Sequence, residues 1–185
     1  MTKFINTPLT DDEVDGLKAG DRVLLSGIIY TARDAAHKKL IDMMDRGEEL
    51  PMELKGQVIY YVGPCPAKPN EVIGSVGPTT SGRMDAFTSA LLERGLKGMI
   101  GKGERSQEVI SSLIRNRAVY FAATGGAGAL LAEAVKKARV IAFPELGPEA
   151  IYMLKVQNFP VTVAIDAKGT DLYKAGRKNY ERQGR

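Results

Sequence analysis

Residues 22–47 read "RVLLSGIIYTARDAAHKKLIDMMDRG", and this stretch decides the fold class. Its first part, residues 22–32, is a short run rich in Val, Leu and Ile, which predicts a buried strand. In residues 33–47 the apolar residues recur at helical spacing instead, up to a final glycine. This pattern predicts an amphipathic helix. A buried strand followed at once by an amphipathic helix is the repeating unit of α/β proteins.

The rest of the chain continues this alternation, so we predict an α/β fold with a mixed sheet and flanking helices. Further strands are expected within residues 55–64, 96–103, 118–124, 139–143 and 159–169, and helices or helical turns within 11–18, 84–94, 106–116, 125–138 and 144–154. The sequence has no internal repeat and no interior linker, and its length suffices for one continuous core. We therefore expect residues 1–185 to form one domain, with 173–185 as a flexible tail.

The composition is that of a soluble globular protein, with 44% hydrophobic and 26% charged residues. Lys and Arg exceed Asp and Glu by only 26 to 22, and the few aromatic residues are not interleaved with basic ones, so we expect no nucleic-acid partner. No stretch of about 20 uninterrupted apolar residues occurs, and the N-terminus has no apolar signal core. These features predict a cytoplasmic protein without a membrane span.

The densest cluster of small donor residues is "GSVGPTTSGRMDAF", residues 74–87, which leads into a predicted helix. With Gly82 near the N-cap, Asp85 would lie in the first turn, where its charge suits the helix dipole. The free amides of that helix start and the hydroxyls of residues 79–81 would form a cradle for an anion. Arg83 would add a two-pronged donor that fits a carboxylate or phosphate. Ordinary helix capping beside a solvated arginine explains the same residues equally well.

Two further cations follow predicted strands. Arg33 lies at a strand-to-helix turn, with His37 four residues later on the same helical face. Lys102 lies between two glycines directly after a strand, where it is either a surface turn or a loop that delivers an ammonium group to an anion. A single histidine and a single cysteine cannot build a metal site or hold an iron–sulfur cluster, so we predict no metal ligand in this chain. The residues by themselves suit a small dicarboxylate or similar anion and name no reaction.

Several long strings carry a resemblance to a known family: "GDRVLLSGIIYTARDAAHKK", "GPCPAKPNEVIGSVGPTTSGRMDAF", "YFAATGGAGALLA" and "ELGPEAIYMLKVQNFPVTVAID". Over about residues 5–170 the chain resembles the β subunit of the class I, iron–sulfur-dependent fumarate hydratases and the C-terminal domain of their single-chain forms. It is similar, less closely, to the tartrate dehydratase β subunit. The resemblance implies a swivelling β/β/α domain and the reversible hydration of fumarate to (S)-malate, a hydro-lyase reaction of the tricarboxylic acid cycle.

The resemblance also implies a partner. In that family a 4Fe–4S cluster is carried by the α part, where an open iron binds the substrate hydroxyl and one carboxylate as a Lewis acid. Cys65, in "GPCPA", is then not a cluster ligand, and this chain is expected to be active only in a heteromer with an α subunit. A homo-oligomer formed through either subunit stays open.

Four site residues follow from the matching motifs. Arg33, in "TARD", and Arg83, in "TTSGR", resemble the arginines that hold the substrate carboxylates, and Lys102, in "GKG", resembles a carboxylate-binding lysine. Thr79 resembles the hydroxyl that lies against the substrate and takes part in moving the C3 proton. The resemblance thus assigns Thr79, Arg33 and Arg83 to catalysis and all four residues to substrate binding, with His37 as a support for Arg33. The alternatives are an L(+)-tartrate dehydratase β subunit and a stand-alone module that binds small anions.

Overall fold

The structure is a computed structural model, and it describes residues 2–124 and 126–181. Its strands are β1 (Thr2–Asn6), β2 (Arg22–Thr31), β3 (Val58–Tyr60), β4 (Gly98–Gly101), β5 (Val119–Ala122), β6 (Val135–Ala142) and β7 (Ile151–Ile165). Its helices are α1 (Asp11–Asp15), α2 (Asp34–Asp45), α3 (Asp85–Glu93), α4 (Gln107–Arg115), α5 (Gly128–Glu133) and α6 (Leu172–Glu181), with 3₁₀ helices η1 (Ser81–Met84) and η2 (Pro144–Glu149). Strands and helices alternate through β5, as the sequence predicts.

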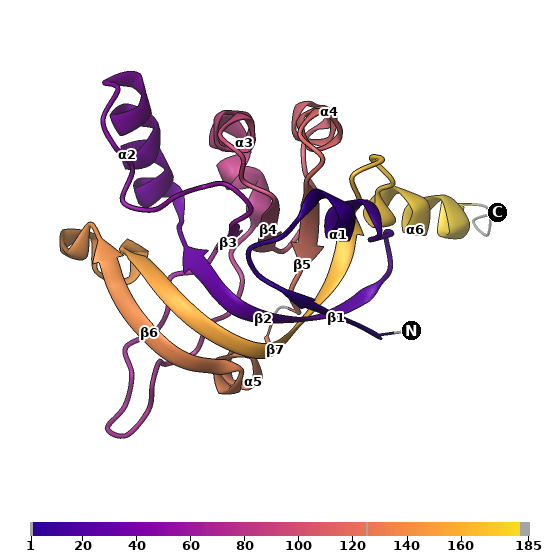
Figure 1. The fold of residues 1–185 in the computed structure, drawn as a ribbon. Helices are drawn as coiled ribbons and strands as arrows, with labels where there is room; N and C mark the ends of the chain where they lie inside the picture. The colour runs from indigo at the N-terminus through magenta and orange to yellow at the C-terminus, as the bar shows by residue number, and fades with distance from the viewer. Residues whose placement is uncertain (1, 125, 182–185) are drawn as a thin grey trace.

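The strands form one mixed sheet that closes on itself. Its order is β1-β2-β3-β4-β5-β7-β6, and an additional pairing of β2 with β7 joins β2, β3, β4, β5 and β7 into a five-stranded barrel (Figure 1). Strands β1 to β5 pair in parallel, whereas β7 runs antiparallel to β2, β5 and β6. The predicted α/β fold with a mixed sheet and flanking helices is therefore confirmed.

The bend of β2 allows this closure. The register between β2 and β7 shifts between Leu25 and Gly27, which marks a β-bulge, and Gly27 adopts a φ of +114°. A Cβ atom at Gly27 would lie 2.5 Å from Oγ1 of Thr7, so only glycine fits in β2 where the chain that leaves β1 passes it. The start of β2 pairs with β1 and its end pairs with β3.

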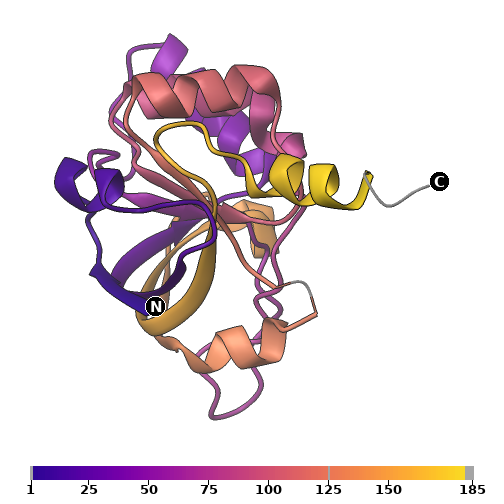
Figure 2. The ribbon, with the colours of Figure 1, turned by 90° about the vertical axis from the view of Figure 1, so that its right-hand side faces the viewer.

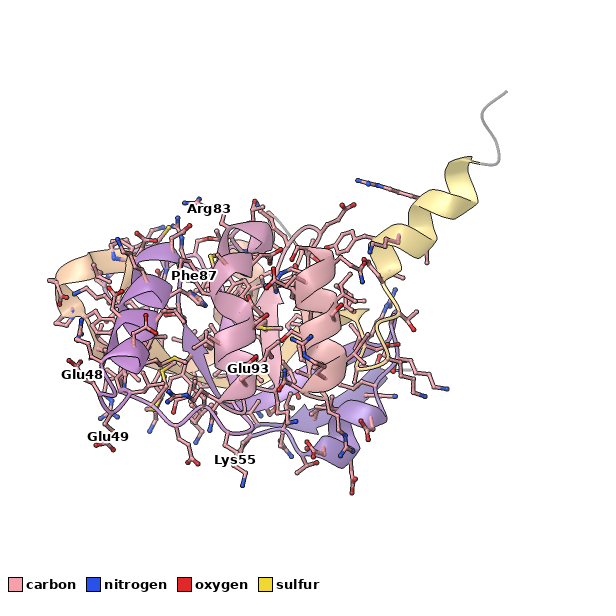
Figure 3. The ribbon with its side chains drawn as sticks, turned by 90° about the horizontal axis from the view of Figure 1, so that it is seen from above. Glu48, Glu49, Lys55, Arg83, Phe87 and Glu93 are labelled. Atoms are coloured by element: carbon pink, nitrogen blue, oxygen red, sulfur yellow. The ribbon has the colours of Figure 1, made fainter. Side chains whose placement is uncertain are left out.

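Helices α2, α3 and α4 cover one face of the sheet, and they lie side by side when the molecule is seen from above (Figures 2 and 3). Neighbouring residues of a strand point to opposite faces, so β5 sends Phe121 into one hydrophobic cluster and Tyr120 into another. The first cluster lies inside the barrel, with Leu25 and Phe159 among its fully buried members. The second lies between the sheet and helices α2, α3 and α4.

Two predicted helices are partly wrong. Residues 125–138 were expected to form a glycine turn followed by a helix, but α5 ends at Glu133 and β6 begins at Val135. Residues 144–154 were expected to form a turn and a helix, but β7 begins at Ile151, directly after η2. In both places local helix propensity is overridden because the backbone pairs with β7 or β2, contacts that join residues far apart in sequence. The strand β1 was not predicted at all.

The expected tail was residues 173–185, and α6 (Leu172–Glu181) covers residues 173–181 of it, while residues 182–185 lie outside the described residues. The hydroxyl of Tyr173 accepts a hydrogen bond of 3.2 Å from the backbone N–H of Gly103, so the start of α6 contacts the loop after β4. Among the residues that the structure describes, none belongs to a helix with the length and hydropathy needed to span a membrane.

Candidate functional site

The candidate site lies at the carboxyl ends of the parallel strands. Strands β2, β3 and β4 pair in parallel, so their last residues lie along one edge of the sheet. Arg33 follows β2 and Lys102 follows β4 directly. In α/β sheets, ligand sites form at such an edge because the loops that leave the strands converge there.

Thr79 and Lys102 come together through their backbones. The N–H of Thr79 donates to the carbonyl of Tyr61 at 2.7 Å, and the N–H of Lys102 donates to the carbonyl of Thr79 at 3.3 Å. The N–H of Ser81 in turn donates to the carbonyl of Lys102 at 2.9 Å. Residues 79–81 thus form a short extended segment between the ends of β3 and β4, which places Thr79 beside Lys102.

Arg33 and Arg83 come together around Asp34. Nε of Arg83 donates to Oδ1 of Asp34 at 2.9 Å, and Nη2 of Arg33 lies 3.8 Å from Oδ2 of the same carboxylate. The side chain of Arg83 is 55% exposed, and that of Arg33 is 27% exposed. Figure 3 shows Arg83 at the beginning of α3, at the edge of the molecule. One aspartate thereby connects the start of α2 to the last turn of η1.

The guanidinium of Arg33 is only partly satisfied by protein groups. Nε of Arg33 lies 3.5 Å from Oε1 of Glu149, but this contact lacks hydrogen-bond geometry, and the buried Nε has no hydrogen-bond partner among the described residues. A Cβ atom on Gly63 would lie 3.1 Å from Nη1 of Arg33, so the chain just beyond Tyr61 also borders this side chain. In the described part of the chain, Nε of Arg33 thus lacks the acceptor that buried donors usually have.

His37 is buried at the start of α2 and contacts the backbone of Arg33. Its Nδ1 lies 2.8 Å from the carbonyl of Arg33, which can only accept, so Nδ1 carries the proton. The ring is fully buried, edge-on to Tyr61 at 5.4 Å and stacked on Phe87 at 5.8 Å. Burial lowers the pKa of His37 to about 4, although the hydrogen bond to Arg33 opposes this shift. His37 is therefore neutral at pH 7.

The helix start after "TTSG" differs in detail from the sequence prediction. Gly82 lies inside η1, whose N-cap is Thr80, and α3 begins at Asp85. The hydroxyl of Ser81 is buried and hydrogen-bonded to the hydroxyl of Tyr120 at 2.8 Å, so it does not contribute to an anion cradle. Asp85 is in the first turn of α3, as expected.

Sequence reasoning missed a buried ion pair beneath the site. Nε of Arg105 donates to Oδ1 of Asp85 at 2.6 Å, and the Arg105 side chain has no exposed surface. Burial by itself would lower the pKa of Arg105, but Tyr61 and Asp85 outweigh it and the net shift is upward. Asp34 and Glu149, the two carboxylates beside Arg33, were missed as well. Asp34 had a local signal, since it follows Arg33 at a helix start, whereas Arg105 in "GKGERS" looks like part of a surface loop.

The donor set of this chain does not fit an iron–sulfur cluster. Cys65 is its one cysteine and is exposed, whereas a cluster needs several thiolates. Within residues 2–124 and 126–181, no group of three or more His, Cys, Asp or Glu side chains could hold a metal ion. A cavity of ≈ 600 Å³ lies between the segment around Cys65 and α5, and none of the four predicted site residues lines it.

The comparisons with known proteins cover almost the whole chain. Residues 3–176 match the family described as Fumarase C-terminus. The chain belongs to this family. The putative L(+)-tartrate dehydratase subunit beta of Methanocaldococcus jannaschii is 42% identical over 181 residues, which are 94% of this chain and 93% of that protein.

Two fumarate hydratases also match this chain, but over a smaller part of their own length. Fumarate hydratase 2 of Leishmania major is 40% identical over 83% of this chain and 28% of that protein. The aerobic class I fumarate hydratase of Salmonella typhimurium is 37% identical over 92% of this chain and 30% of that protein. The chain thus spans less than a third of these relatives. The family match and these relatives confirm the resemblance that the sequence predicted. The relatives named fumarate hydratase and tartrate dehydratase are hydro-lyases.

Proposed function

We propose that this chain is the β part of a two-part hydro-lyase that hydrates fumarate reversibly to (S)-malate. The observation that carries the proposal is the grouping at one sheet edge: Arg33 and Arg83 share Asp34, while Thr79 and Lys102 share backbone hydrogen bonds. Fumarate and malate carry two carboxylates, and cationic donors beside one hydroxyl are suited to bind them.

The cations would first bind and orient the substrate. The exposed guanidinium of Arg83 binds Asp34 through Nε, and among the described residues its terminal nitrogens have no hydrogen-bond partner. Those nitrogens present two parallel donors, the arrangement that fits a carboxylate. Nζ of Lys102 likewise has no hydrogen bond or ion pair within the described part of the chain, and the residue is exposed. Both groups are thus available to an incoming dicarboxylate.

The same cations would lower the barrier of the proton transfer. Removing the C3 proton of malate places negative charge on the adjacent carboxylate, and fixed cations stabilise that charge as it develops. We assign contact with the C3 proton to the Thr79 hydroxyl. A threonine hydroxyl is a poor base by itself, so a carboxylate or arginine neighbour from this chain or from the partner must assist it.

The proposal includes a partner chain. One cysteine cannot supply the thiolates of a 4Fe–4S cluster, so we assign the cluster to an α subunit. The name "subunit beta" of the M. jannaschii relative and the short coverage of the fumarate hydratases support this division. A cytoplasmic location, a role in the tricarboxylic acid cycle and further oligomerisation stay predictions.

A second candidate, L(+)-tartrate dehydratase activity, is favoured by one observation. The M. jannaschii relative matches this chain nearly from end to end and is named for tartrate rather than fumarate. The two substrates are both dicarboxylates, so the cations would serve either one. A stand-alone anion-binding module would instead bind carboxylates without any partner.

The deciding experiment is anaerobic purification of the protein from its native host, followed by identification of what copurifies. We expect an iron–sulfur chain in the complex and turnover of fumarate, measured side by side with L(+)-tartrate. Faster turnover of tartrate would replace the first candidate with the second. A protein that purifies alone and binds dicarboxylates without turnover would overturn both.

A further inference from the structure

Arg105 is an arginine enclosed by protein groups. Its side chain has no exposed surface, and burying a charge is costly unless it is paired and hydrogen-bonded. Nε donates to Asp85 at 2.6 Å and Nη2 donates to the hydroxyl of Thr88 at 2.6 Å, both on α3. Its Cζ lies 5.4 Å from the ring centre of Tyr61 and 5.0 Å from that of Tyr120, within cation–π distance. Arg105 thus joins α3 to Tyr61, which directly follows β3, and to Tyr120 within β5.

One partner of Arg105, Tyr120, contacts both the loop after Lys102 and the segment that contains Thr79. The hydroxyl of Tyr120 lies 2.9 Å from the carbonyl of Gly103 and 2.8 Å from the hydroxyl of Ser81. A tyrosine has one hydroxyl proton and the carbonyl can only accept, so Tyr120 donates to Gly103 and accepts from Ser81. Gly103 follows Lys102, and Ser81 lies two residues after Thr79. This tyrosine therefore holds together the two segments that carry the lysine and the threonine.

The other partner of Arg105 fixes the end of the same loop. Oδ2 of Asp85 accepts a hydrogen bond of 2.7 Å from the N–H of Ser106, the N-cap of α4, while its Oδ1 is occupied by Arg105. The Asp85 carboxylate at the start of α3 thereby binds two consecutive residues, Arg105 and Ser106, of the loop that follows Lys102. The loop is anchored at Gly103, Arg105 and Ser106, although the ammonium group of Lys102 has no partner of its own among the described residues.

From these contacts we infer that Arg105 is a positioning residue for the site: bound to Asp85, it fixes the backbone that carries Lys102 relative to the segment that carries Thr79. The inference rests on the proposed function, because it gives those two residues a common substrate. Arg105 itself has no exposed surface with which to touch that substrate. A lysine in its place would keep the charge but lose the planar fork that reaches Asp85 and Thr88 together.

The test uses the assembled enzyme with its partner chain and combines Arg105→Lys with Lys102→Met. We expect Arg105→Lys to lower kcat/KM at least about 10-fold when Lys102 is present and less than about 3-fold in the Lys102→Met background, because coupled residues are not additive. Equal losses in both backgrounds would mean a general structural effect and would overturn the inference, as would no loss. Arg115→Lys, an exposed arginine at the end of α4 without an ion pair in the described chain, is the matched control.

A second readout does not depend on turnover. Amide hydrogen exchange at Lys102, Gly103 and Ser106 should become faster in assembled Arg105→Lys than in Arg115→Lys, while exchange within β4 stays unchanged. If the parent enzyme turns over neither fumarate nor tartrate, the proposed function fails, and this exchange pattern still decides whether Arg105 fixes the loop. Unchanged exchange at all three amides would overturn the inference. Should Arg105→Lys not fold, Thr88→Val, which removes one acceptor, should show the same pattern in weaker form.

Discussion

Nε of Arg83 donates a hydrogen bond of 2.9 Å to Oδ1 of Asp34, a residue 49 positions away in sequence. Asp34 is the first residue of α2 and directly follows Arg33, so this contact sets two arginines on either side of one carboxylate. Without Asp34, two cations at this edge would repel each other, and Nε of the exposed Arg83 would lose the carboxylate that accepts its hydrogen bond. The pairing therefore suggests how the chain keeps both guanidinium groups in place before a substrate arrives.

Asp34→Asn should weaken substrate binding. The amide keeps the shape but loses the charge that orients Arg83, and an ion pair this exposed contributes about 0.2–1 kcal/mol. We expect kcat/KM of the assembled enzyme to fall by up to about 5-fold, mainly through KM. Asp42→Asn is the control, because Asp42 is exposed on the same helix and its side chain has no partner in the described residues. Equal kinetics for the two variants would contradict this role of Asp34.

Arg83→Lys should cost at least about 2 kcal/mol of transition-state binding, a loss of about 30-fold in kcat/KM, if the guanidinium fork holds a carboxylate. Lysine keeps the charge but offers a point donor in place of two parallel ones. Steady-state kinetics of the reconstituted enzyme measure this loss, and Arg94→Lys, at the other end of α3, serves as the control. An unchanged kcat/KM would remove Arg83 from the site.

His37 should make the chain less stable in mild acid. Its pKa is about 4 in the folded chain, whereas its ordinary value, which applies to the unfolded chain, is 6.5. Between these two pH values the unfolded chain therefore binds more protons than the folded chain. The free energy of unfolding therefore falls as the pH drops from 6.5 to about 4, by about 3 kcal/mol in total. Urea unfolding at a series of pH values measures this slope.

The control for His37 is His37→Gln, which has no group that titrates in this window. Its free energy of unfolding at neutral pH is expected to be lower, but it should lose much less stability between pH 6.5 and 5 than the parent. This range lies above the region where the carboxylates protonate, so their ion pairs contribute little there. Parallel slopes for the two proteins would show that His37 is not held neutral in the folded chain.

Gly101→Ala should disturb the contact between β4 and the Thr79 segment. The new Cβ atom would lie 1.9 Å from Oγ of Ser81 and 3.0 Å from Cδ2 of Tyr61. Overpacking of this kind costs about 1–3 kcal/mol of stability, which thermal or urea unfolding detects. Gly77→Ala is the control, since a Cβ atom there meets nothing within 4 Å. If the Ser81 hydroxyl is the obstacle, Gly101→Ala should cost less in a Ser81→Ala background, and an equal cost would refute that explanation.

Cys65→Ser should leave the iron–sulfur cluster of the assembled enzyme unchanged. Cys65 is exposed, and one thiolate cannot hold a cluster that needs several. The visible absorbance of the anaerobically reconstituted complex reports the cluster directly. Loss of that absorbance relative to the parent complex would show that this chain contributes a ligand.

The sequence by itself determined the elements whose character is set by neighbouring residues. The apolar run before Arg33 and the helical spacing of apolar residues after it are enough to specify β2 and α2, because both are local properties of the sequence. The cations Arg33 and Lys102 were also visible, since a charged residue directly after a strand needs no knowledge of the fold. Long matching strings, rather than physical chemistry, singled out Thr79.

Only the tertiary structure decided what these elements meet. The pairing of β2 with β7 closes the barrel and turns residues 151–154 from an expected helix into strand. The contact of Arg83 with Asp34 and the burial of Arg105 against Asp85 join residues from different elements. The physical reason is the same in each case: burial and pairing depend on segments that are distant in sequence, and no local pattern of residues encodes that proximity.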